Sequence, residues 1–249
     1  VMPTLHSTAN LSYSIAMTTK PDPSRFAHVT DWVFDLDNTL YPHRSNLFSQ
    51  IDVKMTGYVS DLLSLSRDDA RKLQKELYKE YGTTLSGLMA RHKIDPDDFL
   101  EKVHDIDYSW LVPNPELGAA IHQLPGRKFI LTNGDRRHAE RTARQLGILE
   151  HFEDIFDIVA ADLMPKPYAE TYDRFFDRHG VDPKEAAMFE DIAHNLEVPH
   201  SRGMVTTLVV PRSQDEVERE VWEIATGSEP HIDFVTDDLA AFLEGVVTR

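Results

Sequence analysis

Short runs of β-branched and aromatic residues alternate with helical segments along most of this chain, and several runs end abruptly in acidic or amide residues. The first run covers residues 28–34 and leads into Asp35-Leu-Asp-Asn-Thr-Leu-Tyr-Pro42. Later runs cover residues 127–131, 155–159, 186–189 and 204–210, with an edge strand expected at 233–236. Helical patterns lie between or after them, at 116–123, 136–146, 168–179, 217–224 and 239–243. This alternation predicts an α/β fold with βαβ units and a parallel sheet.

A long stretch without any strand pattern interrupts the alternation after the first strand. Apolar residues recur at three- and four-residue spacing from Leu47 to Leu63, and Asp95-Pro96 begins a further helix. We therefore expect an inserted helical domain at residues 44–112, within an α/β core made of residues 29–43 and 113–249. Residues 1–28 are mixed and polar, and we expect them to form a loosely ordered leader.

The charge balance excludes several classes of partner. Lys and Arg total 26 against 42 Asp and Glu, so the formal net charge is −16. Nucleic-acid polymers and anionic membrane surfaces both attract basic proteins, so neither is an expected partner. The chain has no cysteine, which excludes disulfides and thiolate zinc sites. No run approaches the roughly 20 apolar residues that span a bilayer, and the cytoplasm is the expected location.

Polar side chains follow four of the expected strands. In a parallel α/β sheet, ligands bind beyond the carboxyl ends of the strands, so these side chains should converge on one crevice. They are Asp35 and Asp37, Thr132 and Asn133, Lys166, and Glu190 and Asp191. Four acids held close together repel one another unless a cation is present. Mg²⁺ prefers oxygen ligands, so it is the expected cofactor.

The same residues suggest a covalent reaction at phosphorus. Asp35 is a candidate nucleophile because a carboxylate needs no deprotonation near neutral pH. Asp37, two residues further, is a candidate general acid and base. The hydroxyl of Thr132, the amides of Asn133 and Gly134, and Lys166 are candidate donors to the phosphoryl oxygens.

Four motifs, taken in order, resemble those of the haloacid dehalogenase-like superfamily. They are Phe34-Asp-Leu-Asp-Asn-Thr-Leu40, Thr132-Asn133, Lys166-Pro167 and Glu190-Asp191 with Asn195. The resemblance implies a Rossmann-like three-layer core and a Mg²⁺-dependent phosphohydrolase. It implies metal ligation by Asp35, the Asp37 main-chain carbonyl and Asp191, with Glu190 as a direct or water-mediated ligand. Asn195 would either reach the metal shell or orient Asp191.

A narrower resemblance, to the pyrimidine 5′-nucleotidase branch, covers more of the chain. It rests on Asp37-Asn-Thr-Leu-Tyr-Pro42, Tyr81-Gly-Thr-Thr-Leu-Ser-Gly-Leu-Met89, Leu131-Thr-Asn-Gly-Asp-Arg-Arg-His-Ala139 and Asp154-Ile-Phe-Asp157. In that branch the inserted helices form a cap over the active site. The implied substrates are small phosphorylated molecules, in particular nucleoside monophosphates such as UMP and CMP.

Several alternatives stay open on the sequence. They are a phosphatase for another small ester such as a sugar phosphate or phosphoglycolate, a phosphomutase, a 2-haloacid dehalogenase, and a non-catalytic protein that binds phosphorylated ligands. Dehalogenating relatives lack an acid at the position of Asp37, so its presence favours phosphoryl chemistry. His138, His194 and His200 are interpreted as surface or core histidines.

Overall fold

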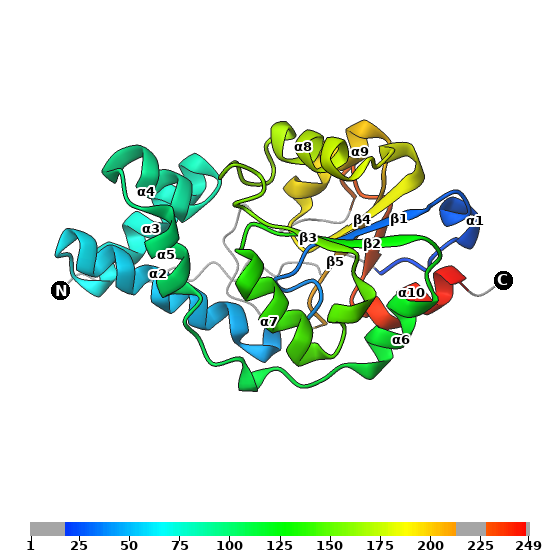
Figure 1. Ribbon diagram of the computed structural model, residues 1–249, viewed down its shortest axis with the longest axis horizontal. Coiled ribbons are helices and arrows are strands. Elements are labelled where there is room, and N and C mark those ends of the chain that lie inside the picture. The colour runs from blue at the N-terminus through cyan, green and yellow to red at the C-terminus, as the bar shows by residue number, and fades with distance from the viewer. Residues whose placement is uncertain (1–17, 213–227, 248–249) are drawn as a thin grey trace, which may run out of the picture.

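A six-stranded parallel sheet forms the centre of the protein. The computed structural model describes residues 18–212 and 228–247 (Figure 1). The strands are β1 (Asp31–Phe34), β2 (Arg127–Leu131), β3 (Asp154–Phe156), β4 (Ala186–Glu190), β5 (Val205–Val209) and β6 (Phe234–Thr236). Their order across the sheet is β3-β2-β1-β4-β5-β6, and all neighbours run parallel. The predicted α/β fold with a parallel sheet is therefore confirmed, and β6 is an edge strand as expected.

Alternate residues of β1 enter different hydrophobic layers. Trp32 and Phe34 belong to one buried cluster, whereas Val33 belongs to a second. Successive side chains of a strand point to opposite faces, and all four residues of β1 are buried, so the strand is covered on both faces. Phe34 stacks on Phe189 of the neighbouring strand β4, with ring centroids 4.8 Å apart. Such a strand lies in the middle of a three-layer fold.

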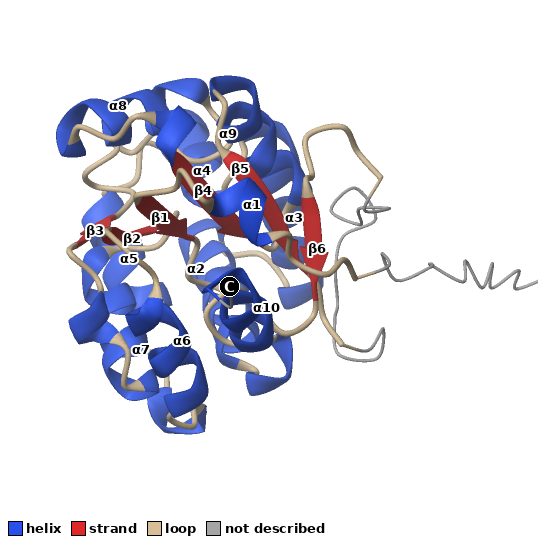
Figure 2. Cartoon of the chain, turned by 90° about the vertical axis from the view of Figure 1, so that its right-hand side faces the viewer, coloured by secondary structure: helices blue, strands red, loops and turns tan. Residues whose placement is uncertain are grey.

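Helices cover both faces of the sheet (Figure 2). The first buried cluster contains residues of α6 (Pro115–Gln123), α7 (Arg136–Leu146) and α10 (Leu239–Val247). The second contains residues of α8 (Ala169–His179) and is joined by Val198 of α9 (Glu197–Arg202). The helix expected at 217–224 lies outside the described residues. Within the described ranges, no helix is both long and apolar enough to cross a bilayer.

Four α-helices lie between β1 and α6 in the sequence. They are α2 (Leu47–Leu63), α3 (Arg67–Tyr81), α4 (Thr84–His92) and α5 (Pro96–Val103). Local signals fix their ends: the Ser66 hydroxyl accepts the Asp69 N–H at 3.2 Å, and Gly82 ends α3 with a φ of 80°. These helices lie to one side of the sheet (Figure 1). They fall within the stretch predicted as an inserted helical domain.

The end of the expected leader differs from the prediction. Residues 23–26 form the short helix α1 (Pro23–Phe26), and the Phe26 ring is buried and stacks on Trp32 at 5.9 Å. The Thr19 N–H donates to the carbonyl of Val235 in the edge strand at 2.8 Å. The packed core therefore begins before residue 29, because an aromatic side chain covers the end of the sheet. Residues 1–17 lie outside the described ranges.

Candidate active site

The predicted site residues meet at the carboxyl ends of the strands. Strand β1 lies between β2 and β4, so the polar segments after these three strands are neighbours. The Asp35 N–H donates to the Phe189 carbonyl of β4 at 2.9 Å, which extends the sheet pairing up to the candidate nucleophile. The sheet order thus brings residues more than 150 positions apart in sequence to one edge.

Three buried carboxylates lie close together there. Oxygen atoms of Asp35, Glu190 and Asp191 lie within 4.8 Å of one another. Their exposed fractions are only 6%, 1% and 5%. The Nε2 atom of His43 lies 3.6 Å from Asp191 Oδ2. The expected gathering of distant acids around Asp35 is therefore present.

Lys166 brings positive charge into this cluster. Its Nζ donates to Asp35 Oδ1 at 2.6 Å and to Glu190 Oε1 at 2.8 Å, and the side chain is buried. Burial alone would lower the pKa of Lys166, but the charges of Asp35 and Glu190 outweigh it and raise that pKa. Burial raises the pKa of Asp35 to about 7, although Lys166 opposes the rise. The Lys166 ammonium group thus offsets part of the negative charge of the three buried carboxylates.

Glu190 is surrounded by donors. Besides Lys166, the Asn195 side-chain amide donates to Glu190 Oε1 at 2.6 Å, and the Ile192 N–H donates to Oε2 at 2.6 Å. The Tyr172 hydroxyl in turn donates to the Asn195 carbonyl at 2.6 Å. The role of Asn195 was left open by the sequence, and the structure directs its side-chain amide to Glu190.

The segment after β2 is fastened to the Lys166 loop. The Lys166 N–H donates to Asn133 Oδ1 at 2.8 Å, and Asn133 Nδ2 donates to the Lys166 carbonyl at 3.2 Å. The Gly134 N–H donates to the Thr132 hydroxyl oxygen at 3.0 Å. The Asn133 side chain thus holds two active-site segments together, a contact that the sequence analysis did not anticipate.

Asp37 lies beside two residues that were not among the predicted site residues. The Tyr41 hydroxyl hydrogen-bonds Asp37 Oδ1, and His138 Nε2 lies 2.9 Å from the same oxygen. Burial raises the pKa of Asp37, but the His138 charge and the hydrogen bonds from His138 and Tyr41 outweigh it, so the net shift is downward. His138 is buried, but its place in the first turn after the Thr132-Asn133 segment was the available signal for a site contact.

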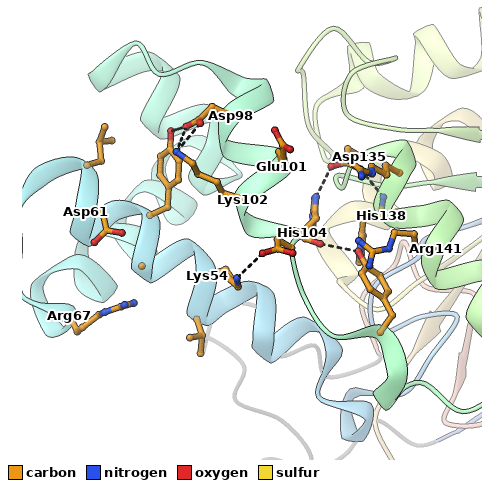
Figure 3. Close-up of a pocket in the computed structure, with 17 residues that line it drawn as sticks. Lys54, Asp61, Arg67, Asp98, Glu101, Lys102, His104, Asp135, His138 and Arg141 are labelled. Carbon is orange, nitrogen blue, oxygen red and sulfur yellow. Dashed lines mark hydrogen bonds and ion pairs between the residues drawn. The ribbon is translucent and has the colours of Figure 1, made fainter.

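A cavity of about 940 Å³ opens between α2, α5 and α7 (Figure 3). His104, Tyr108 and His138 form part of its wall. Charged side chains from both sides also line it, among them Lys54, Glu101, Lys102, Arg137 and Arg141. The cavity therefore lies between the inserted helices and the core, with Asp37 behind the His138 ring.

Known proteins resemble this chain in sequence or in fold. The chain is 27% identical over 162 residues to phosphate metabolism protein 8 of Saccharomyces cerevisiae, an alignment that covers 60% of this chain and 49% of that protein. The chain thus matches about half the length of this curated relative. CbbY from Rhodobacter sphaeroides, solved in complex with phosphate, has a TM-score of 0.58 at 18% identity and covers 88% of this chain and 99% of its own.

A dehalogenase also shares the fold. L-2-haloacid dehalogenase from Xanthobacter autotrophicus, with chloropropionic acid covalently bound, has a TM-score of 0.53 at 17% identity and covers 87% of this chain and 97% of its own. At 17% and 18% identity, the dehalogenase and CbbY show only that this chain shares their fold. Residues 33–198, which include all the predicted site residues, match the haloacid dehalogenase-like hydrolase family. The chain therefore belongs to the haloacid dehalogenase-like hydrolases.

Proposed function

We propose that this protein is a Mg²⁺-dependent phosphomonoester hydrolase that forms an aspartyl-phosphate on Asp35. The observation that carries the proposal is the convergence of Asp35, Glu190 and Asp191 within 4.8 Å, with Lys166 bonded to two of them. A buried, anionic and oxygen-rich site of this kind can bind a divalent cation and a phosphoryl group together.

The proposed reaction has two steps. An Asp35 carboxylate oxygen bonds to phosphorus as the bond from phosphorus to the ester oxygen breaks, and Asp37 gives its proton to the departing oxygen. Water then attacks phosphorus and gives a proton to Asp37, while the bond between phosphorus and Asp35 breaks. Phosphate leaves, and both carboxyl groups return to their starting states.

The residues present fit a magnesium ion. Asp35 and Asp191 would hold it through carboxylate oxygens, together with the Asp37 main-chain carbonyl. Glu190 already accepts hydrogen bonds from Lys166, Asn195 and Ile192, which supports a role in orienting Lys166 rather than in direct ligation. When bound, Mg²⁺ neutralises carboxylate and phosphoryl charge. Burial raises the pKa of Asp35 even though Lys166 opposes the rise, which supports a need for further positive charge.

Thr132, the Asn133 and Gly134 main-chain amides and Lys166 are the proposed donors to the phosphoryl oxygens. Thr132, Asn133 and Gly134 lie just before α7, and Lys166 joins them from the loop before α8. We also propose that residues 44–112 act as a cap over a core made of residues 29–43 and 113–249. The cavity between α2, α5 and α7 supports this division, since residues of both parts line it.

Pyrimidine nucleoside monophosphates such as UMP and CMP are the proposed substrates. The support is the resemblance of Asp37–Pro42, Tyr81–Met89 and Leu131–Ala139 to the pyrimidine 5′-nucleotidase branch. Asp37 favours phosphoryl transfer over cleavage of a carbon–halogen bond, because a halide leaves without a proton whereas an alkoxide needs one.

A release screen tests the proposal. Purified protein with Mg²⁺ is offered pyrimidine and purine monophosphates, sugar phosphates, phosphoglycolate and 2-chloropropionate, and free phosphate and chloride are measured. We expect phosphate release, fastest from UMP or CMP, and none from the Asp35→Asn variant. Chloride release without phosphate release would replace the proposal with a dehalogenase. Transfer of the phosphoryl group to a second position of the substrate would indicate a mutase.

A further inference from the structure

The two carboxylate oxygens of Asp37 have different neighbours. Oδ1 is held by the Tyr41 hydroxyl and by His138 Nε2 at 2.9 Å. Oδ2 lies 3.8 Å from where a β-carbon on Gly134 would stand. Both neighbours can donate to Oδ1, through the Tyr41 O–H and the His138 Nε2–H, whether Asp37 is ionised or carries the proton of the proposed reaction on Oδ2. The proton that Asp37 exchanges is then left to Oδ2, which faces the Thr132–Gly134 segment.

We infer that His138 is a positioning residue for Asp37. Tyr108 and His104, in the segment that follows α5, hold the His138 ring in place. The inference rests on the proposed function, because positioning matters only if Asp37 transfers a proton. A rotation of the Asp37 side chain would carry Oδ2 away from the Gly134 side. Misplacement of a reacting group by about 1 Å can cost on the order of 10²-fold in rate.

His138 cannot turn freely in its pocket. Its side chain is fully buried, and its Nδ1 atom lies 2.9 Å from the Tyr108 hydroxyl. The same hydroxyl lies 3.2 Å from the His104 carbonyl oxygen, and its single proton can serve one of these two contacts at a time. The His104 ring stacks on the His138 ring at 4.4 Å, with an interplanar angle of 8°. Both ring nitrogens and one ring face of His138 are thus engaged.

A second contact fastens the same segment to the core. His104 Nδ1 lies 2.7 Å from Asp135 Oδ2, and Asp135 caps α7 by accepting the His138 N–H at 2.7 Å (Figure 3). The Arg141 guanidinium covers the Tyr108 ring at 3.9 Å. Residues 104–108 therefore connect the end of α5 to the acid–base carboxylate through one side chain, His138. If the inserted helices shift relative to the core, Asp37 loses this support.

Leaving-group dependence tests the inference. The kcat/KM of each variant is measured with 4-nitrophenyl phosphate, whose leaving group needs little protonation, and with the alkyl phosphomonoester that the wild type hydrolyses fastest. His138→Leu should lose about 10²-fold on the alkyl ester and less than about 10-fold on the aryl ester. His138→Gln keeps an amide donor near the Nε2 position and should recover most of the lost rate. Tyr108→Phe should show the same selectivity at about 10-fold.

His179→Leu is the matched control, because His179 packs among Phe129, Phe156 and Phe175 near the amino ends of the strands. It should leave both rates unchanged. Equal losses on both esters in His138→Leu, or no recovery in His138→Gln, would overturn the positioning role.

A spectroscopic readout separates this inference from the proposed function. The ¹⁵N resonances of the His138 ring should shift in Asp37→Asn and in Tyr108→Phe, because each change removes one hydrogen-bond partner. Resonances that do not move in either variant would overturn the inference. A wild type that hydrolyses neither ester contradicts the proposed function instead, and the resonances then decide the His138 contacts by themselves.

Discussion

Replacement of Asp35 by Asn should change how the stability of the metal-free protein depends on pH. Burial raises the pKa of Asp35 from its usual 3.8 to about 7 in the folded protein. Between these values the folded state binds more protons than the unfolded state, so the stability contribution is complete below pH 4 and is lost as the pH rises through 7. The rise corresponds to about 4 kcal/mol, of which about 3 kcal/mol falls between pH 5 and pH 8.

Urea unfolding in EDTA measures this effect. Asn does not titrate, so the free energy of unfolding of the variant, relative to wild type, should increase by about 3 kcal/mol from pH 5 to pH 8. Using the change between two pH values removes any constant cost of replacing the hydrogen bond to Lys166. A relative stability that stays constant over this range would refute the electrostatic reasoning. At pH 8, added Mg²⁺ should raise the Tm of wild type by more than that of the variant, because the variant lacks one anionic ligand.

Three further outcomes are expected. Asp37→Asn should lower the rate of phosphate release by about 10²–10⁴-fold while circular dichroism shows an unchanged fold, and a fully active variant would rule out the acid–base role. Lys166→Met removes the buried partner of Asp35 and Glu190 and should lower the free energy of unfolding by about 3–5 kcal/mol, so a loss below about 1 kcal/mol in urea would contradict the ion-pair account. Phe34→Ala, which empties a buried site stacked on Phe189, should cost about 3–5 kcal/mol by the same measurement, and a stability equal to wild type would show that this contact is not part of the core.

The strand pattern was sufficient to predict the parallel sheet, but not the residues at which each strand begins and ends. The run at 28–34 contains β1, and the run at 155–159 overlaps β3, although each observed strand is shorter. Hydrophobic periodicity reports burial, and buried apolar residues continue beyond the last paired residue. Phe26 was assigned to the leader because its sequence neighbours are polar. Its burial depends on Trp32, Phe234 and Phe242, which lie in three other elements.

The residues of the candidate site were also only partly predictable from the sequence. Asp35, Lys166, Glu190 and Asp191 could be predicted because each lies at the carboxyl end of an expected strand or in the loop after one, and parallel strands end at a common edge. Tyr41 and His138 could not be assigned to Asp37 by that argument. Tyr41 reaches it across one turn of a loop, and His138 reaches it from the first turn of α7.

The sequence by itself determined the alternating elements, the strand-end acids and the family, because local patterns and short motifs carry that information. Only the tertiary structure decided which donors each carboxylate receives: Lys166 and Asn195 on Glu190, and Tyr41 and His138 on Asp37. A hydrogen bond forms within about 3 Å, and such a distance between residues 101 positions apart is set by the packing of α7 against the sheet.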